Sequence, residues 1–156
     1  MPEATDLAEK LRVEGEKFAA IFASLTNGQW DTVVYTEGET WTMLNVLSHI
    51  VSSERSLLKL FERIRTTGKG SAEDFSIDRY NSVQQQKTKD ISAQELLEQY
   101  KEARSNSVIW VSSLKEEELE IQGRHPFLGM TTIRDMIKML YIHNQNHYRD
   151  MKKAIK

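Results

Sequence analysis

The sequence contains no cysteine, and this absence excludes three kinds of chemistry. The protein has no disulfide bond, no thiolate ligand for a metal ion and no cysteine nucleophile of its own. Helix-breaking residues are also scarce, because 156 residues include only two prolines and seven glycines, while leucine, glutamate, lysine, glutamine and serine are plentiful. This balance favours an all-α chain.

Long apolar segments and strong net charge are absent as well. No apolar run approaches the length of a transmembrane helix, and the opening residues Met-Pro-Glu-Ala-Thr-Asp do not resemble a signal peptide. The net charge is −2 at pH 7, and no long run of lysine and arginine marks a nucleic-acid-binding surface. We therefore expect a cytoplasmic protein with no membrane partner and no nucleic-acid partner, formed by a single domain over residues 1–156.

Hydrophobic periodicity predicts four long helices. Thr42 is a good N-cap for the second helix, and Ser92 with Glu95 forms a capping box before the third. The connection over residues 66–90 is far longer than the roughly two to eight residues that join antiparallel neighbours, so it predicts a crossover that leaves helices 2 and 3 parallel. We interpret residues 116–130 as a loop. The predicted four-helix bundle has helices at residues 6–26, 42–65, 92–115 and 131–153.

Two histidines on the last predicted helix suggest a metal site. His143 and His147 are four residues apart and therefore share one helical face. On a helical wheel they fall within the apolar stripe of this helix, where aliphatic side chains are expected. Buried polar groups need partners, and a metal ion would satisfy both imidazoles at once. A hydrogen-bonded pair in the core is the alternative.

His49 on the second helix is the candidate third ligand. It lies seven residues after Thr42, about 10 Å from the helix start, and His147 lies six residues before position 153, about 9 Å from the other helix end. If these helices are antiparallel, both histidines fall at one level. Three imidazoles leave other coordination positions for water or substrate, which is typical of a catalytic site. Small or uncharged polar residues beside His49 predict a groove or cavity: Asn45, Ser52, Ser53 and Ser56.

Three further ionisable residues have open roles. Glu54 falls on the apolar face of the second helix and is a candidate buried carboxylate. We interpret Glu14 as a residue at the boundary of the apolar stripe of the first helix, and a carboxylate linked to the metal is the less favoured alternative. His125 precedes a proline, and we interpret it as a surface or turn histidine, with a substrate contact as the alternative.

Two segments of the chain resemble one known family. The segment from Trp41 to Ile50, followed by Glu54, resembles the helix-2 motif of the DinB-like superfamily, a family of DNA-damage-inducible metalloproteins with bacillithiol- and mycothiol-dependent transferase branches. Residues 129–133 and 143–147 resemble its helix-4 motif. The resemblance covers the whole chain in helix order and loop lengths. It implies a four-helix bundle with a crossover, a divalent ion held by three histidines, and a homodimer. The ligands would be His49, His143 and His147.

The resemblance also implies a function. It suggests a metal-dependent transferase that acts on a small-molecule substrate with a low-molecular-weight thiol as cosubstrate. Since the chain has no cysteine, any thiol must come from outside. Two alternatives stay open, a hydrolase that uses a metal-bound water and a non-catalytic stress protein that binds a metal or small ligand. Imidazole suits several divalent ions, and we expect Zn²⁺ or Ni²⁺.

Overall fold

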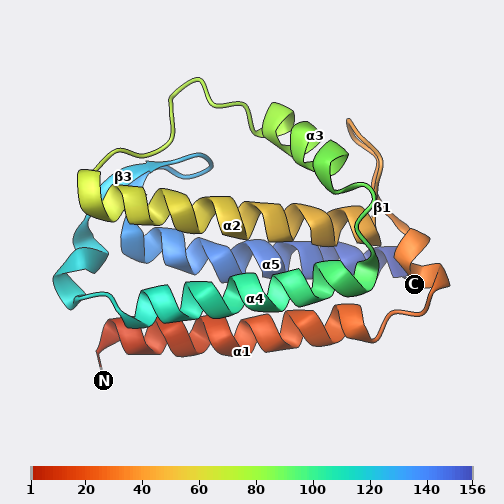
Figure 1. Ribbon diagram of the computed structural model, residues 1–156, viewed down its shortest axis with the longest axis horizontal. Coiled ribbons are helices and arrows are strands. Elements are labelled where there is room, and N and C mark those ends of the chain that lie inside the picture. The colour runs from red at the N-terminus through yellow and green to blue at the C-terminus, as the bar shows by residue number, and fades with distance from the viewer. Residues whose placement is uncertain (1, 156) are drawn as a thin grey trace.

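A computed structural model describes residues 2–155 as an elongated bundle of four long helices (Figure 1). These helices are α1 (Glu3–Ala23), α2 (Met43–Thr67), α4 (Ala93–Ser112) and α5 (Ile133–Ile155). Figure 1 shows that α1 and α5 run in one direction and that α2 and α4 run in the opposite direction. The four-helix bundle and the parallel arrangement of α2 and α4 are therefore confirmed.

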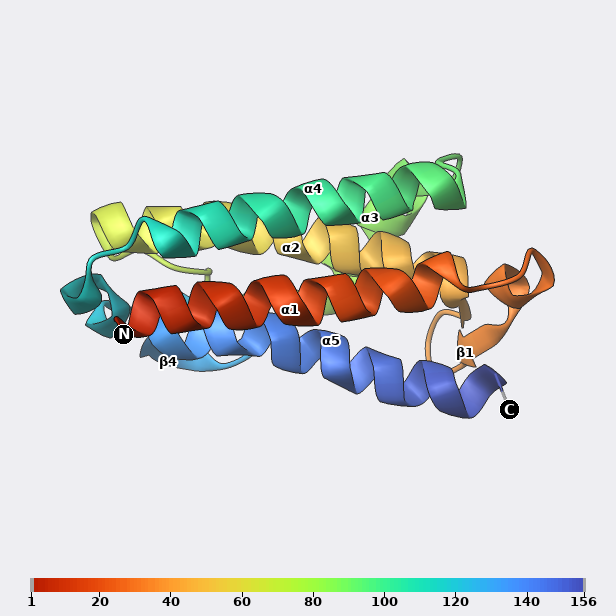
Figure 2. The ribbon, with the colours of Figure 1, turned by 90° about the horizontal axis from the view of Figure 1, so that it is seen from below.

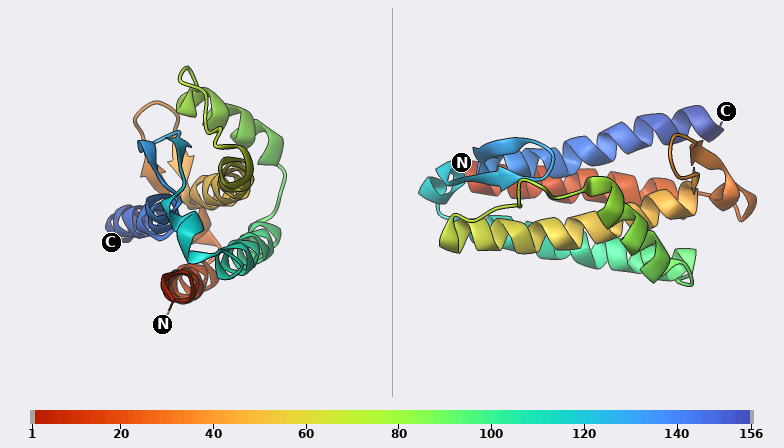
Figure 3. Two further views of the ribbon diagram at one scale, coloured as in Figure 1. Left: turned by 90° about the vertical axis from the view of Figure 1, so that its left-hand side faces the viewer. Right: turned by 90° about the horizontal axis from the view of Figure 1, so that it is seen from above.

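The first two long helices, α1 and α2, do not pack as neighbours. Both α1 and α2 pack against α4 and α5, so that α1 lies diagonally across the bundle from α2. The end-on view in Figure 3 shows this order, and Figure 2 shows α1 beside α5. The crossover makes α2 and α5 antiparallel neighbours, which is the arrangement that the histidine prediction requires.

The ends of α1 differ from the prediction of residues 6–26. The helix begins at Glu3 and ends at Ala23, and Pro2 at its N-cap supplies no side-chain hydrogen bond. The carboxylate of Glu116 caps it instead, accepting from the backbone N–H of Glu3 at 2.6 Å and of Ala4 at 3.0 Å. A cap supplied by a distant segment satisfies the free N–H groups of a helix start as a local one does.

The start of α2 confirms the predicted N-cap. The backbone N–H of Thr42 donates to Oδ1 of Asn45 at 2.9 Å, and the backbone N–H of Asn45 donates to Oγ1 of Thr42 at 3.4 Å. Asn45 thus completes the reciprocal capping box that glutamate or glutamine usually forms. Gly68, with φ of 74°, ends the helix in the left-handed conformation.

The crossover contains a helix that periodicity did not reveal, α3 (Ile77–Thr88). It buries none of its residues, so it carries no strong apolar stripe. Polar contacts hold it on α2: Asn45 Nδ2 donates to Gln85 Oε1 at 3.0 Å, and Gln85 Nε2 donates to Asn45 O at 2.8 Å. The hydroxyl of Tyr80 donates to Ser52 O at 3.0 Å. Part of the small polar strip on α2 therefore docks α3.

Two short hairpins and two 3-10 turns complete the described chain. Strands β1 (Val33–Tyr35) and β2 (Trp41–Thr42) pair before α2. Strands β3 (Gln122–His125) and β4 (Gly129–Thr132) pair before α5, within the segment predicted as a loop. The 3-10 turns are η1 (Gly28–Asp31) and η2 (Glu116–Glu120). None of the helices within residues 2–155 combines the length and the apolar character needed to cross a membrane.

The core is divided into two apolar clusters with a polar layer between them. One cluster joins Leu11, Phe61 and Met136 at one end of the bundle, and the other joins Phe22, Leu47 and Met151 at the opposite end. On each long helix the residues between the clusters are polar or small: Gly15, Glu54, Arg104, Ser107, His143, Asn144 and His147. Two of the three predicted metal ligands, His143 and His147, lie in this polar layer, and the third, His49, lies on α2 beside residues of the second cluster.

Candidate metal centre and substrate cleft

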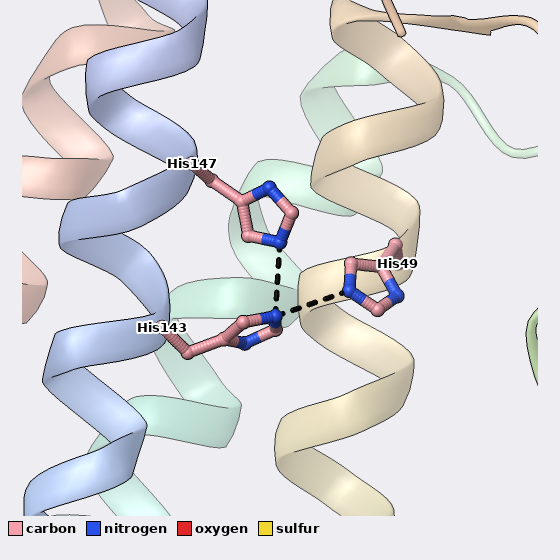
Figure 4. A group of neighbouring side chains, drawn as sticks. All are labelled: His49, His143 and His147. Atoms are coloured by element: carbon pink, nitrogen blue, oxygen red, sulfur yellow. Dashed lines mark hydrogen bonds between the residues drawn. The ribbon is translucent and has the colours of Figure 1, made fainter. Parts of the chain in front are cut away.

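The structure brings the three predicted histidines together (Figure 4). His143 Nε2 lies 2.9 Å from His147 Nε2 and 3.3 Å from His49 Nε2. One ring nitrogen from each residue falls within 4.8 Å of the other two. His49 projects from α2 and the pair projects from α5, so the antiparallel contact between these helices assembles the group, here called the triad.

The pair on α5 lies beside the buried stripe of that helix and not within it. His143 and His147 are half-buried, whereas Asn144 between them is buried and donates from Nδ2 to the hydroxyl of Tyr100 at 2.9 Å. His49 is at the boundary between buried and half-buried, with 9% of its surface exposed. The wheel prediction of a core-facing pair is therefore corrected, since the imidazoles lie at the edge of the core.

Burial keeps the triad neutral. Desolvation, followed by the neighbouring imidazoles, lowers the pKa of His147 to about 2. Desolvation and then His143 lower the pKa of His49 to about 3, against a hydrogen bond with Asn81. Desolvation also lowers the pKa of His143, although the charge of Glu54 opposes the shift. Neutral imidazoles keep a lone pair for a metal ion.

A tyrosine sets the tautomer of one triad member. The hydroxyl of Tyr35 donates to Asp150 Oδ2 at 2.6 Å and lies 2.8 Å from His147 Nδ1. Since its only proton goes to Asp150, the phenol oxygen must accept from Nδ1–H of His147. The Nε2 lone pair of His147 then faces the other two histidines. Metal-bound histidines have partners of this kind, which hold the ring in position.

The spacing of the triad fits a divalent ion. Two nitrogens bonded to one zinc ion at about 2.0–2.1 Å are about 3.3 Å apart at a tetrahedral angle and about 2.9 Å apart at a right angle. The two short Nε2–Nε2 distances in the triad are 3.3 and 2.9 Å. Neutral donors of matching type and spacing mean that this cluster can hold a metal ion.

The triad lines a cleft of about 1280 Å³. Its other walls come from the β1–β2 connection, α3, the segment before α3 and the β3–β4 turn. Ser53 and Ser56 also line it, so the groove predicted from the small polar strip is confirmed for these residues and His49. Aromatic side chains contribute much of the wall: Tyr35, Trp41, Phe75, Tyr80 and Phe127.

His125 is the last residue of β3, paired with Gly129 directly before the β3–β4 turn, and it is not on the surface, so the prediction of a surface or turn histidine is wrong. Only 3% of it is exposed, and Nδ1 accepts from the backbone N–H groups of Phe127 and Leu128 at 3.0 and 3.1 Å. Desolvation, with a smaller effect of His143, lowers its pKa to about 4. The β3–β4 hairpin folds His125 inward, and this could not be inferred while the segment was interpreted as a loop.

Glu54 is buried, as the sequence suggested, and its partner was missed. Arg104 Nε and Nη2 donate to the two carboxylate oxygens of Glu54 at 2.7 and 2.8 Å, and Nη1 donates to Leu11 O at 3.0 Å. Gly15 makes room, because a Cβ there would lie 2.5 Å from Arg104 Cγ. A carboxylate on the apolar face of a helix requires a cationic partner when it is buried. The position of Glu54 was therefore the signal in the sequence that such a partner exists. Glu14 is half-buried beside Lys10 and does not join the triad.

The fold and the site together define a class of protein, a crossover four-helix bundle with three convergent histidines that can hold a metal. The sequence profile of the DinB superfamily matches residues 10–151. The chain belongs to the DinB superfamily, as its motifs indicated. A comparison with curated proteins found no match.

Solved structures with the same fold include proteins of different described roles. YfiT from Bacillus subtilis, described as a probable metal-dependent hydrolase with an unusual four-helix bundle topology, matches with a TM-score of 0.71 and 15% identity over 97% of this chain and 83% of its own. The colibactin self-resistance protein ClbS, in complex with dsDNA, matches with a TM-score of 0.75 and 17% identity over 98% and 95%. At these identities the matches show the fold alone.

One expectation from composition is overturned by this comparison. The prediction of no nucleic-acid partner used the small net charge and the lack of basic runs. ClbS shares the fold and was crystallised with dsDNA, so the exclusion is wrong. The physical reason is that net charge averages over the whole surface, whereas a DNA contact needs only a local group of cations and donors.

Tyr35→Phe should weaken metal binding about 10- to 100-fold, because it removes the acceptor that holds Nδ1–H of His147. Competition with a chromophoric chelator on zinc-loaded protein measures the change. Tyr148→Phe is the matched control, since Tyr148 is also half-buried but lies against Lys152. Equal affinities of the two variants would show that Tyr35 has no part in orienting the triad.

Metal-free protein should lose stability as the pH falls below about 6.5, the unperturbed pKa of histidine. All four histidines have lowered pKa values in the folded state, so below this pH the unfolded chain takes up protons that the folded chain does not. The loss approaches about 1.4 kcal/mol per pH unit for each histidine that stays neutral. Urea unfolding at pH 7, 6 and 5 tests this, and a flat midpoint would contradict it.

Proposed function

We propose that the protein is a metal-dependent enzyme in which His49, His143 and His147 hold a divalent ion in the wall of the cleft. The supporting observation is the convergence of three neutral imidazoles on a space wide enough for substrates. Within residues 2–155 the group offers three ligands, whereas closed structural zinc sites use four. When bound, the ion supplies a Lewis acid that lowers the pKa of a thiol or a water molecule.

The remaining residues of the site position groups and restrict water. Tyr35 holds the proton of His147 on Nδ1 and so keeps Nε2 free. The ring of Trp41 packs 4.9 Å from that of His49, centroid to centroid, and covers one side of the triad. Apolar walls lower the local dielectric, which strengthens the interaction between charges that develop there.

The leading form of this proposal is transfer of a low-molecular-weight thiol to a small electrophile. The superfamily resemblance suggests the thiol, and the lack of cysteine means that it must enter as a cosubstrate. The cleft volume of about 1280 Å³ exceeds the roughly 300–1,000 Å³ typical of a site for one small ligand. This volume favours a reaction in which two small molecules bind together.

Hydrolysis is the second candidate, with water as the nucleophile. It is favoured by the likeness to YfiT, which is described as a probable metal-dependent hydrolase. Zn²⁺ or Ni²⁺ remains our prediction for the ion, since imidazole ligands suit both. Metal analysis of protein purified without a histidine tag tests the ion. The homodimer suggested by the superfamily resemblance also remains a prediction.

The test uses untagged protein loaded with zinc or nickel and a panel of electrophiles. Chloroarenes are offered with cysteine, glutathione, bacillithiol or mycothiol, and nitrophenyl esters are offered without thiol. Thiol-dependent turnover that His147→Ala abolishes supports transfer, and ester cleavage without thiol supports hydrolysis. Tight metal binding with neither activity would favour the non-catalytic binding protein. His125→Ala cannot serve as the control for these activity measurements, because His125 lines the same cleft.

A further inference from the structure

Two residues in the wall of the cleft each carry a buried hydrogen-bonding group that has no partner. Among residues 2–155, the buried side-chain polar atoms without a hydrogen bond are Nε1 of Trp41 and Nε2 of His125. Both residues line the cleft that contains the triad. Buried polar groups are nearly always hydrogen-bonded, so each exception requires an explanation. That both fall in one cleft points to a common cause.

Both atoms are donors. The indole nitrogen of Trp41 carries a proton and cannot accept. His125 Nδ1 accepts from the backbone N–H groups of Phe127 and Leu128, so the proton of its neutral ring is on Nε2. Two residues that line the cleft thus each carry a buried N–H group without an acceptor, and the complementary group on a ligand is an oxygen acceptor.

The two donors lie in different parts of the cleft. The ring of Trp41 is beside His49, with 4.9 Å between ring centroids. The ring of His125 is 6.3 Å from that of Phe61, which lies twelve residues and about 18 Å further along α2 than His49. A ligand that reaches both donors must therefore be elongated, with one end beside the triad.

The walls between and around the donors are apolar and aromatic. Phe75 and Phe127 line the cleft and keep 42% and 65% of their surface exposed, which is high for phenylalanine. Their rings are available to an apolar ligand at little cost in reorganisation. The cleft therefore offers aromatic contact along its length and hydrogen-bond donors at separate points.

We propose, building on the metal-dependent function above, that Trp41 and His125 donate hydrogen bonds to the substrate. The substrate class is an elongated, largely apolar small molecule with a carbonyl or carboxylate oxygen at each end. The oxygen at Trp41 lies beside the triad, where the reaction takes place. The oxygen at His125 fixes the length and register of the bound molecule, which makes His125 a specificity-determining residue.

The probes for this proposal are biphenyl-4,4′-dicarboxylate and the neutral biphenyl-4,4′-dicarboxamide, with biphenyl-4-carboxylate as the single-acceptor control. Binding is followed by the ¹H–¹⁵N signal of the Trp41 indole, identified by its loss in Trp41→Phe, in zinc-loaded and metal-free protein. We expect a downfield shift of this proton in both forms, since the donors act independently of the ion. Tighter binding of the dicarboxylate indicates a carboxylate ligand, and tighter binding of the dicarboxamide indicates a ligand with neutral carbonyl groups.

Two substitutions at position 125 separate the donor from the turn. His125→Asn keeps an acceptor at the δ position for Phe127 and Leu128 and removes the ε donor, and it should weaken binding of the two-ended probes about tenfold. His125→Gln keeps a donor at the ε position and should bind within about threefold of wild type, since its hydrogen bond to the ligand is retained. Neither should change binding of biphenyl-4-carboxylate, because the proposal places its one carboxylate at Trp41, beside the triad.

Trp41→Phe should weaken binding of all three probes, and Trp30→Phe, whose ring stacks on Phe22, should not. The proposal is overturned if His125→Asn and Trp41→Phe bind as wild type, if the Trp41 indole signal stays in place at saturation, or if the two-ended probes do not saturate the protein at millimolar concentration. Such a failure leaves the metal content of wild-type protein unchanged, so it is distinguishable from a failure of the proposed metal function.

Discussion

Replacing Glu54 or Arg104 alone is expected to lower the free energy of unfolding by about 3–5 kcal/mol, because each change leaves a buried charge without its partner. Both side chains are almost fully buried, with exposures of 3% and 4%, and their two hydrogen bonds are short. For a domain of this size such a loss corresponds to a fall of about 6–20 °C in melting temperature. Calorimetry of Glu54→Leu and Arg104→Met measures it.

The double variant Glu54→Leu/Arg104→Met tests whether the loss of stability comes from an unpaired buried charge. With both charges removed, the desolvation penalty disappears, and the melting temperature should return close to that of wild type. Arg12→Ala is the surface control, since Arg12 pairs with Glu9 and Glu16 in solvent and its loss should leave the transition almost unchanged. A double variant as unstable as the sum of the single ones would show that the pair acts through packing and not through charge.

Removing one triad histidine should lower metal affinity by at least about 100-fold, because loss of an outer partner of a ligand already costs about 10- to 100-fold. His49→Ala and His147→Ala each leave two imidazoles, which seldom hold such an ion against solvent. Mass spectrometry of metal content and chelator competition on untagged protein measure the loss. Circular dichroism confirms that each variant remains folded.

His125→Ala is the matched control for metal binding. His125 is more deeply buried than the triad and also has a lowered pKa, but its Nδ1 is occupied by two backbone N–H groups. Its substitution should leave metal affinity nearly intact. If His49→Ala binds metal as tightly as wild type, the triad assignment is wrong, and the pair on α5 is a core feature.

The triad illustrates how a local pattern and a global arrangement combine. The spacing of His143 and His147 follows from helix geometry alone, so it could be predicted. Their meeting with His49 depended on α2 and α5 being antiparallel neighbours, and the long crossover indicated this arrangement before the structure was known. The direction of the imidazoles, toward a cleft and not into the core, came from the tertiary structure.

The sequence by itself determined the four long helices, the N-caps at Thr42 and Ser92, the parallel course of α2 and α4, and the three histidines that meet. These features follow from periodicity, capping and loop length, which are local properties of the chain. The tertiary structure alone decided the Glu116 cap on α1, the docking of α3, the partner of Glu54 and the burial of His125. In the first three the partners are 28 to 113 residues apart, and His125 is buried by packing across the fold. Periodicity records which face of an element is apolar, but not which distant polar group will satisfy a buried one.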